Sequence, residues 1–403
     1  MSNPLGWLAD ELQSLRDDGL FRHRREVRPF SQSVAGRSGR IMIHGREVWD
    51  FASNNYLGLA SDPAVQSAAE EALKSHGVGS KASPLVSGRT DLHSALESAI
   101  AEFEGTESAI LFPTGMAANL GTVAALAGPG DAVFCDRLNH ASLVDGCRLS
   151  GARLRVYRHE DLDGLRKSLS RESARRLWIV TDTVFSMDGD LAPLPALCEI
   201  AEAAGAGLIV DEAHGTGVFG SLGRGVAELQ HVEDRIAVRI GTLSKAIGAL
   251  GGFVSGSQTL IDYLWNKART QVYSTALPPA LCAAAIAAFE IIRTDPCRRT
   301  RLHHLSSLFR NELQVRGIHP RAGSVGPIVP IEIRDPHAAV SVAEQLQKVG
   351  FLVAAIRPPT VPAGTSRLRV TINCELPGDA VVELADHIGN LLAGLRLEAA
   401  LDV

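Results

Sequence analysis

Short apolar runs rich in β-forming residues recur between helical stretches over residues 51–293. We expect seven of these runs to be strands: Ala109–Phe112, Ala132–Cys135, Leu154–Tyr157, Leu177–Asp182, Gly207–Asp211, Val238–Gly241 and Gly252–Ser255. Several are apolar at every position, which is typical of strands covered on both faces. The spacing predicts helices between them, among others at Asp91–Phe103, Ala117–Leu126 and Pro193–Ala204. The alternation predicts an α/β domain with a mostly parallel sheet.

The ends of the chain follow other patterns. Apolar residues of Leu5–Leu20 have helical spacing, and four arginines follow, which we interpret either as a solvated surface or as a functional arm: Arg22, Arg24, Arg25 and Arg28. A helix is expected at Ala280–Thr294. Beyond it the pattern predicts an α+β region with few strands: Ile328–Ile333, helix His337–Val349, Phe351–Ile356, Arg367–Ile372 and helix Ala380–Leu395. The expected domains are an arm (1–50), a large domain (51–293) and a C-terminal domain (294–403).

Composition narrows the class of protein. The 403 residues are 45% hydrophobic and 21% charged, which excludes a disordered, collagen-like or coiled-coil chain. The net charge of −5 argues against a nucleic-acid binder. The longest apolar run, Ala280–Phe289, is shorter than the roughly 20 residues of a membrane span. Asp10 and Glu11 in an N-terminus without a basic region argue against a secretory signal. Six cysteines without a CxxC pair predict reduced, buried thiols in a cytoplasmic protein.

Lysine is rare in this chain, and Lys245 has an unusual setting. There are six lysines, and Lys245 lies in a glycine-rich segment after a predicted strand, among small and apolar neighbours. A poorly hydrated ammonium has a lowered pKa, and its amine is then a nucleophile. The segment by itself leaves two interpretations open, a Schiff-base lysine or a lysine whose amine extends to solvent.

Asp211 and His214 come at the end of the predicted strand Gly207–Asp211. In an open parallel sheet, ligands bind outside the carboxyl ends of the strands, so a carboxylate and an imidazole are expected at one rim. The letters DEAH at 211–214 also mark a helicase class. That class requires a Gly-Lys-Ser or Gly-Lys-Thr motif, which this sequence lacks, so a P-loop ATPase is excluded.

Four further segments follow or contain predicted strands, and each is weak evidence alone. Gly115 begins an alanine-rich helix whose free N–H groups suit a phosphate. His140 and Ser186 follow strands and could contact a ligand, although a structural role is equally compatible. Arg367 and Arg369 alternate to one face of a strand, where a guanidinium is the usual partner of a substrate carboxylate.

Together these residues match what pyridoxal 5′-phosphate (PLP) requires of a protein: a lysine, an acid at the ring nitrogen and a phosphate-binding helix start. Over about residues 50–395 the chain resembles the α-oxoamine synthase family of fold-type I PLP enzymes. The segments that carry the resemblance are Ser53–Leu59, Leu85–His93, Asn139–Ser142, Val184–Asp190, Asp211–Gly215, Thr242–Lys245, Tyr273–Pro279 and Arg357–Arg369.

The resemblance implies roles around the PLP ring. Lys245 would be the Schiff-base lysine and the base that removes the α-proton. Asp211 would pair with the pyridinium nitrogen, His214 and Ser186 would contact the ring hydroxyl, and His140 would stack on the ring face. These four catalytic residues, Lys245, His140, Asp211 and His214, are all present in the sequence.

The resemblance also implies a phosphate site shared between subunits. Gly115, Met116 and Thr242 would hold the phosphate. Ser274 and Thr275 would complete this site from the second subunit of a homodimer, because the family's sites lie at a dimer interface. No metal is implied.

The substrate side follows by the same resemblance. Arg367 would bind the amino-acid carboxylate, with Asn54 nearby and His140 above the ring. Thr360 and one arginine of the N-terminal arm, chosen as Arg22, would face the acyl substrate.

The family's fold is aspartate-aminotransferase-like, with a seven-stranded, mostly parallel sheet domain and a smaller α+β C-terminal domain. The branch most similar to this sequence condenses L-alanine with a pimeloyl thioester, on CoA or an acyl-carrier protein, in biotin biosynthesis. Four residues depart from the family pattern: Lys81, Ala82, Pro84 and Arg89. The identity of the acyl donor therefore stays open, and so does the choice of alanine, glycine or serine as the amino acid. The alternatives are another α-oxoamine synthase, such as 2-amino-3-ketobutyrate ligase or a lipid or signal amino-ketone synthase, and a non-catalytic binding subunit.

Overall fold

The computed structural model describes residues 3–29 and 39–401, and it divides into two compact units. Unit 1 comprises the described residues of 1–53, 187–189 and 301–403. Unit 2 comprises residues 54–186 and 190–300. The residues expected to form a separate N-terminal arm therefore share a unit with the C-terminal region, because strands from both ends of the chain pair in one sheet.

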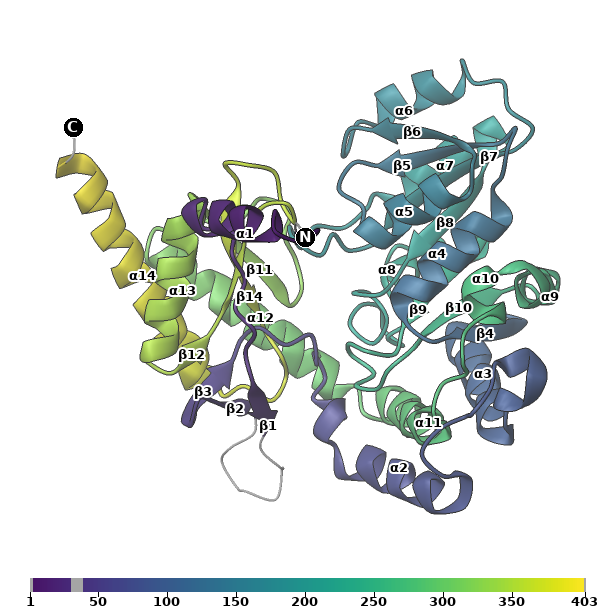
Figure 1. Ribbon diagram of the computed structural model, residues 1–403, viewed down its shortest axis with the longest axis horizontal. Helices are drawn as coiled ribbons and strands as arrows, with labels where there is room; N and C mark the ends of the chain where they lie inside the picture. Colours follow the sequence, from purple (N-terminus) through teal and green to yellow (C-terminus); the bar gives the residue numbers. More distant parts are fainter. Residues whose placement is uncertain (1–2, 30–38, 402–403) are drawn as a thin grey trace. The chain divides into compact units, whose positions relative to one another are not determined.

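Unit 2 is built on a seven-stranded sheet (Figure 1). Along the sheet the strands are β4 (Ser108–Phe112), β10 (Gly252–Gly256), β9 (Val238–Thr242), β8 (Gly207–Asp211), β7 (Leu177–Asp182), β5 (Ala132–Asp136) and β6 (Arg153–Tyr157). Strand β10 is antiparallel to both of its neighbours, and the remaining pairs are parallel. The prediction of seven strands in a mostly parallel sheet is confirmed, with strand ends shifted by one residue at most.

Burial explains why the inner strands are continuously apolar. Strands β5 and β9 are buried at all five positions, because helices cover both faces of the sheet. The core on one side includes Val133, Val180 and Ile209 from the strands and Leu143 from a helix. The edge strand β6 is mostly exposed, which explains its alternation of arginine with apolar residues.

The helices of unit 2 include several with recognisable caps. They are η1 (Leu59–Ser61), α2 (Pro63–His76), the π-helical turn η2 (Pro84–Gly88), α3 (Asp91–Glu104), α4 (Gly115–Leu126), α5 (Ala141–Leu149), α6 (Leu162–Leu169), α7 (Leu194–Ala204), α8 (Val226–Leu229), η3 (Glu233–Arg235), α9 (Gln258–Lys267), α10 (Arg269–Val272) and α11 (Pro279–Thr294). Thr114 caps α4 by accepting a hydrogen bond from the Ala117 amide at 3.0 Å. Gly105 ends α3 in the left-handed region.

The loop that departs from the family pattern precedes η2. Lys81, one of the residues expected to depart from the family pattern, adopts a positive φ of 66°. Gly88 ends the turn, and a Cβ there would lie 2.0 Å from the Ala82 carbonyl oxygen. The turn therefore requires glycine at position 88, where the backbone closes on Ala82.

Unit 1 contains two small sheets. One has the order β1 (Val27–Pro29), β2 (Arg40–Ile43), β3 (Arg46–Asp50) and β12 (Phe351–Leu352), and the other the order β11 (Ile328–Arg334), β14 (Ser366–Thr371) and β13 (Ala354–Ile356). The single strand expected at Phe351–Ile356 is thus wrong. Its first half pairs with β3 and its second half with β14, so the chain changes sheet at Val353.

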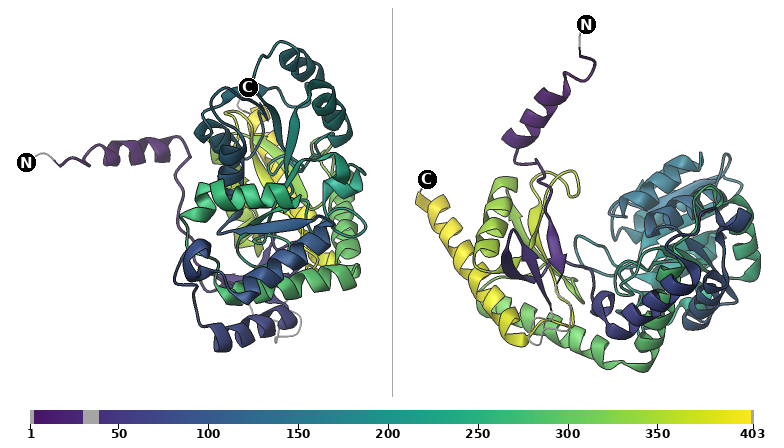
Figure 2. Two further views of the ribbon diagram at one scale, coloured as in Figure 1. Left: turned by 90° about the vertical axis from the view of Figure 1, so that its right-hand side faces the viewer. Right: turned by 60° about the horizontal axis from the view of Figure 1, so that its bottom comes forward.

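Four helices complete unit 1: α1 (Leu8–Asp17), α12 (Cys297–Val315), α13 (Pro336–Lys348) and α14 (Gly378–Leu401). Helix α12 begins four residues before the boundary of the unit. Helix α13 packs on the β11–β14–β13 sheet and against α14 (Figure 1). Helix α1 buries none of its side chains, and Figure 2 shows it standing away from the strands of its unit.

The cysteine prediction is correct for five residues and wrong for one. All six thiols are free, and five are buried, whereas Cys297 at the start of α12 is exposed. Within the part of the chain that the structure describes, no helix combines the length and apolar character needed to cross a membrane.

Gly189 provides a test of the packing in unit 1. Its φ is 72°, and an added Cβ would lie 2.6 Å from the Ile328 carbonyl oxygen. Gly364 has a similar φ of 76° with open space around it. We expect Gly364→Ala to cost about 1 kcal/mol of unfolding free energy, and Gly189→Ala to cost clearly more, measured by urea unfolding. Equal losses in the two variants would contradict the contact with Ile328.

Candidate active site

Lys245 lies on a turn that follows β9. The neighbouring side chains Leu243, Ala246 and Ile247 are buried, and Lys245 itself is half-buried. Its carbonyl accepts a hydrogen bond from the Gly248 amide at 3.0 Å, which closes the turn. The Lys245 charge acts to lower the pKa of His140 and opposes the rise in the pKa of Asp182, so these three groups lie in one electrostatic environment.

Asp211 ends β8 and is only 5% exposed. Its Oδ1 accepts a hydrogen bond from the Ala213 amide at 2.7 Å, and its Oδ2 accepts one from Asn119 Nδ2 at 2.6 Å. Both carboxylate oxygens are therefore held by donors of the chain. Such bonds orient an anion at a site from which water is largely excluded.

A chain of hydrogen bonds connects this carboxylate to His140. Asn119 Nδ2 also donates to Ser142 Oγ at 2.8 Å, and Ser142 Oγ lies 2.7 Å from His140 Nδ1. Burial lowers the pKa of His140 and the Lys245 charge lowers it further, while the Asp211 carboxylate acts in the opposite direction. The neutral imidazole is thus favoured.

Asn119 and Ser142 were not predicted as site residues, although they lie in predicted segments. A signal was available for Asn119. It is one of only two polar side chains in the interior of the otherwise apolar helix α4, and it is 3% exposed. A buried polar residue requires a partner, and here the partner is Asp211.

A second buried carboxylate, Asp182, fixes the loop before α5. Its Oδ2 accepts a hydrogen bond from the His140 amide at 2.6 Å, and its own amide donates to Asn139 Oδ1 at 2.9 Å. Burial raises the pKa of Asp182 well above its ordinary value, and the nearby Asp211 charge raises it further. Asp182 therefore positions the backbone of His140.

His214 contacts Tyr56, which was also not among the predicted site residues. Its Nδ1 lies 2.6 Å from the hydroxyl of the fully buried Tyr56. The same hydroxyl donates to Asn54 Oδ1 at 3.2 Å. Two predicted site residues, His214 and Asn54, are thus joined through Tyr56.

The start of α4 has the features expected of a phosphate site. Among the described residues, the Gly115 and Met116 amides have no acceptor. The next amide, that of Ala117, donates to the Thr114 hydroxyl. A Cβ on Gly115 would lie 3.0 Å from Thr242 Oγ1, so β9 and the helix approach closely. Thr242 Oγ1 donates to the Gly251 carbonyl at 3.0 Å and lies 2.9 Å from Ser244 Oγ. Two free amides at a helix start can bind a phosphate.

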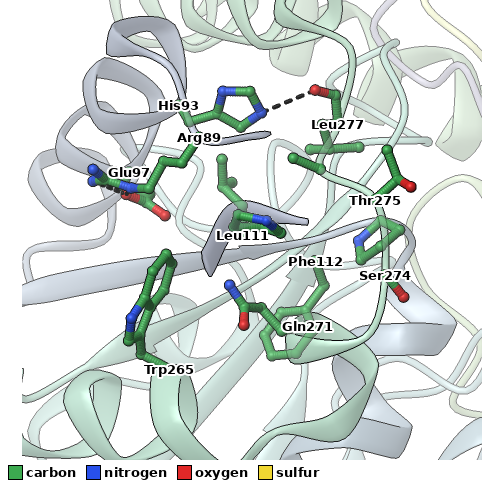
Figure 3. A pocket seen from close by; sticks show the side chains of 13 residues that line it. Arg89, His93, Glu97, Leu111, Phe112, Trp265, Gln271, Ser274, Thr275 and Leu277 are labelled. Carbon is green, nitrogen blue, oxygen red and sulfur yellow. Dashed lines mark hydrogen bonds and ion pairs between the residues drawn. The ribbon is translucent and has the colours of Figure 1, made fainter. Parts of the chain in front are cut away.

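Ser274 and Thr275 line a separate pocket of unit 2 (Figure 3). On its other side, Arg89 forms a 2.6 Å ion pair with Glu97, next to Trp265. The departing residue Arg89 is therefore compensated by an acid of its own chain.

Ser186 is half-buried on the loop after β7, and Asp190 on the same loop is held by the half-buried His159. His159 Nε2 lies 2.8 Å from Asp190, and its Nδ1 lies 3.1 Å from Asp136. Burial by itself would lower the pKa of His159, but the two carboxylates outweigh burial and raise it to about 10. Because both ring nitrogens face acceptors, the imidazolium is the form that fits.

The remaining predicted residues belong to unit 1. Arg367 of β14 is buried and forms an ion pair with Asp188. Arg22 is exposed and donates from Nη2 to the Pro358 carbonyl at 3.3 Å. Thr360 is exposed on the same loop, and its amide donates a hydrogen bond to the Arg357 carbonyl. The structure thus brings Arg22 close to the loop that carries Thr360.

These residues fit PLP on the grounds of their own chemistry. Unit 2 offers an amine, a buried carboxylate with a fixed orientation, an imidazole in its neutral form and two free helix-start amides. A pyridine ring with a phosphate at one end and an aldehyde beside it requires this set of donors and charges. The fold and the site together define a fold-type I PLP-dependent enzyme.

Comparison with known proteins identifies the group more closely. The family of class I and II aminotransferases matches residues 46–388. The chain is 49% identical over 369 residues to an 8-amino-7-oxononanoate synthase of Geobacter sulfurreducens, which covers 91% of this chain and 92% of that relative. Serine palmitoyltransferase from S. paucimobilis, solved with a bound PLP–myriocin aldimine, superposes with a TM-score of 0.91 at 31% identity over 98% of this chain and 100% of that one.

A solved 8-amino-7-oxononanoate synthase from Francisella tularensis has a TM-score of 0.76 at 28% identity, covering 87% of this chain and 99% of that one. The chain belongs to the class I and II aminotransferase family, and within it to the α-oxoamine synthases. It is therefore a PLP-dependent acyltransferase, and enzymes of this family use an amino acid and an acyl thioester. The prediction of family, fold and cofactor is confirmed.

Asn119 can be tested as the residue that positions Asp211. We expect Asn119→Ala to weaken PLP binding about tenfold, because a hydrogen bond to a buried charge is lost. PLP titration of the apoprotein, followed by absorbance, measures the dissociation constant. Asn266→Ala removes an exposed asparagine that bonds only within α9, and it should leave PLP affinity unchanged. A PLP affinity within twofold of wild type for Asn119→Ala would contradict this role.

His159 predicts a pH dependence of stability. Its pKa is raised from about 6.5 in the unfolded chain to about 10 in the folded one. The stabilisation is complete below the unfolded value and is lost as pH rises through the folded value, on the order of 1.4 kcal/mol per pH unit. Between pH 7 and 9.5, wild type should lose this stability and His159→Gln should not, measured by urea unfolding. Parallel profiles for the two proteins would show that His159 is not charged in the folded state.

Proposed function

We propose that this enzyme condenses L-alanine with a pimeloyl thioester, giving 8-amino-7-oxononanoate, CO2 and the free thiol in biotin biosynthesis. The class of reaction follows from the family. The choice of substrates is supported by the relatives, which carry that enzyme's name at 49% identity over most of the chain. The observation that carries the proposal is the buried Asp211 joined through Asn119 and Ser142 to His140, within the electrostatic reach of Lys245.

Bound PLP supplies an electron sink for the carbanion at the amino-acid Cα. Lys245 would hold the cofactor through its amine and, once the substrate amine has replaced it, would take the proton from Cα. Its half-buried position among apolar neighbours limits the hydration of the amine, which suits a nucleophile.

Asp211 would keep a proton on the ring nitrogen. A carboxylate with both oxygens bonded cannot turn away, so its charge stays directed at one place. His140 would lie on the ring face, where its neutral imidazole adds no positive charge beside the lysine. Ser186 and His214 would contact the ring hydroxyl, with Tyr56 holding the imidazole of His214.

The phosphate would bind to the Gly115 and Met116 amides and to the Thr242 hydroxyl. The free amides at the start of α4 support this assignment. Ser274 and Thr275 would serve the phosphate of a second subunit, so the active enzyme would be a homodimer with shared sites. Both side chains line a pocket at the surface of unit 2, which is compatible with a role toward a partner.

Arg367 would bind the carboxylate of the amino acid, with Asn54 beside it. A buried guanidinium is the strongest carboxylate partner among side chains. Thr360 and Arg22 would face the acyl substrate, supported by the contact of Arg22 with the loop of Thr360. The acyl carrier would be CoA or an acyl-carrier protein, and the enzyme would work in the cytoplasm.

One observation favours a second candidate within the family. The solved serine palmitoyltransferase superposes better than the solved 8-amino-7-oxononanoate synthase, with TM-scores of 0.91 and 0.76. Arg89 and Lys81 also depart from the family pattern near the turn η2. An α-oxoamine synthase with another amino acid or acyl chain is therefore the alternative.

A substrate panel decides between these candidates. We expect kcat/KM to be highest for L-alanine with pimeloyl thioester, at least a hundredfold above glycine or serine with acetyl or long-chain thioesters, because the wrong acyl end leaves polar or apolar surface unmatched. Product identified by mass spectrometry is the readout. Preference for a long-chain thioester with serine would overturn the proposal in favour of the second candidate.

Lys245 provides the control for the same panel. Borohydride reduction of the PLP-loaded protein should fix the cofactor on Lys245, identified by peptide mapping. Lys245→Ala should lose this labelling and all condensation activity, whereas Lys267→Ala, which removes an exposed lysine of α9, should keep both. Labelling at another lysine would refute the assignment.

A further inference from the structure

Arg367 does not stand alone in unit 1, because Asp188 joins it to a second arginine. Asp188 Oδ1 accepts a hydrogen bond from Arg367 Nη1 and another, at 2.6 Å, from Arg321 Nη1. Asp188 and Arg367 are buried, whereas the Arg321 side chain is 45% exposed. We name these three residues the Asp188 cluster. None of them except Arg367 has a role in the proposed reaction so far.

The contacts of Arg367 fix how its guanidinium is turned. Nε donates to the Thr365 carbonyl at 3.0 Å, and Nη1 donates to the Met187 carbonyl at 3.2 Å as well as to Asp188. Within the described residues, Nη2 has no acceptor. Three acceptors of the chain therefore hold one side of the group and leave the Nη2 donors for an external anion.

The charges of the cluster are unbalanced by one. Two guanidinium groups and one carboxylate sum to +1, and one bound carboxylate would make the total zero. Both arginines bond to the same oxygen, Oδ1, so Arg321 compensates Asp188 from the side facing solvent. Without Arg321, the negative charge of Asp188 would act undiminished on any carboxylate bound to Arg367.

The backbone around Asp188 is held firmly. The Val325 amide donates to the Gly189 carbonyl at 2.8 Å, and Gly189 packs against Ile328 so closely that a Cβ would not fit. The same loop is anchored by Arg310, which donates to the carbonyls of Gly326 and Ile328. Asp188 is thus a fixed support and not a side chain on a loose loop.

We propose that Asp188 is the positioning residue of the carboxylate site at Arg367, and that Arg321 screens Asp188 so that the α-carboxylate of the amino acid is not repelled. The bound state is then an alternating row of charges: Arg321, Asp188, Arg367 and substrate. This inference rests on the proposed function, because it takes Arg367 as the carboxylate site. Asp188 and Ser186 are two residues apart in the sequence.

The test compares two ligands that differ only in the carboxylate. L-Alanine and L-alaninamide both carry the amine that reacts with the PLP-loaded enzyme, and the absorbance change of the holoenzyme gives a dissociation constant for each. The ratio of the two constants isolates the contribution of the carboxylate. A defect in PLP binding or in folding weakens both ligands alike and leaves this ratio unchanged.

Two single variants and their combination give distinct expectations. Asp188→Asn should lower the preference for alanine about tenfold, because Arg367 is no longer held in place. Arg321→Met should lower it about threefold, and added salt should restore part of the loss, because the unscreened charge of Asp188 repels the ligand. In the Asp188→Asn background, Arg321→Met should have no further effect, since no charge remains to be screened.

Arg334→Met is the matched control, because it removes an arginine of the same unit that is 80% exposed and pairs only with Glu332. It should leave the ratio unchanged. If Asp188→Asn does not fold, Arg321→Met decides, because its partly exposed side chain is replaced without opening the core.

An unchanged ratio in both single variants overturns the inference. If alanine and alaninamide lose affinity equally, the ratio is unchanged and the cluster is structural support only. An additive effect in the double variant overturns the screening role of Arg321. Failure of the proposed function looks different: the wild-type enzyme would then bind alanine no better than alaninamide, or neither of them.

Discussion

The site depends above all on a negative charge kept in a buried place. A carboxylate that is 5% exposed is unfavourable unless donors surround it, and Asp211 receives one from the Ala213 amide and one from Asn119. Asn119 in turn joins Ser142, and Ser142 joins His140. One buried anion therefore determines the orientation of side chains on α4, on α5 and at the end of β8. A cofactor ring bound there meets a fixed charge, and this fixed charge is the electrostatic basis of the catalysis.

A similar solution recurs at two further charged groups of the described chain. His159 lies between two carboxylates, and Asp188 lies between two guanidinium groups. In each case the central group is bonded to two partners of opposite charge, which restrict its orientation and compensate its loss of hydration. The segment that follows β7 contains several of these groups within five residues, from Ser186 to Asp190. Its conformation depends on Gly189, because no side chain fits between this segment and Ile328.

The sequence predicted the large sheet well and the small ones poorly. The seven strands of unit 2 are continuously apolar, so their positions were evident from the pattern. Strands β1 to β3 are short and partly exposed, and β3 pairs with β12, about three hundred residues away, which no local pattern indicates. The stretch at 351–356 looked like one strand because it is uniformly apolar, yet it serves two sheets. For the site, lysine rarity and strand ends indicated Lys245 and Asp211. The sequence pattern did not indicate four residues whose partners are distant in the chain: Asn119, Tyr56, Asp188 and Arg321.

Residue types and their order were enough to determine the α/β class, the cofactor and the family, because PLP chemistry requires an amine, an acid and a phosphate-binding turn at strand ends. The tertiary structure decided how each charged group is held. Hydrogen bonds such as that from Asn119 to Asp211, 92 positions apart, form only when the sheet brings its strand ends together. Orientation and compensation of buried charge are properties of three-dimensional neighbours, and the linear sequence does not contain them.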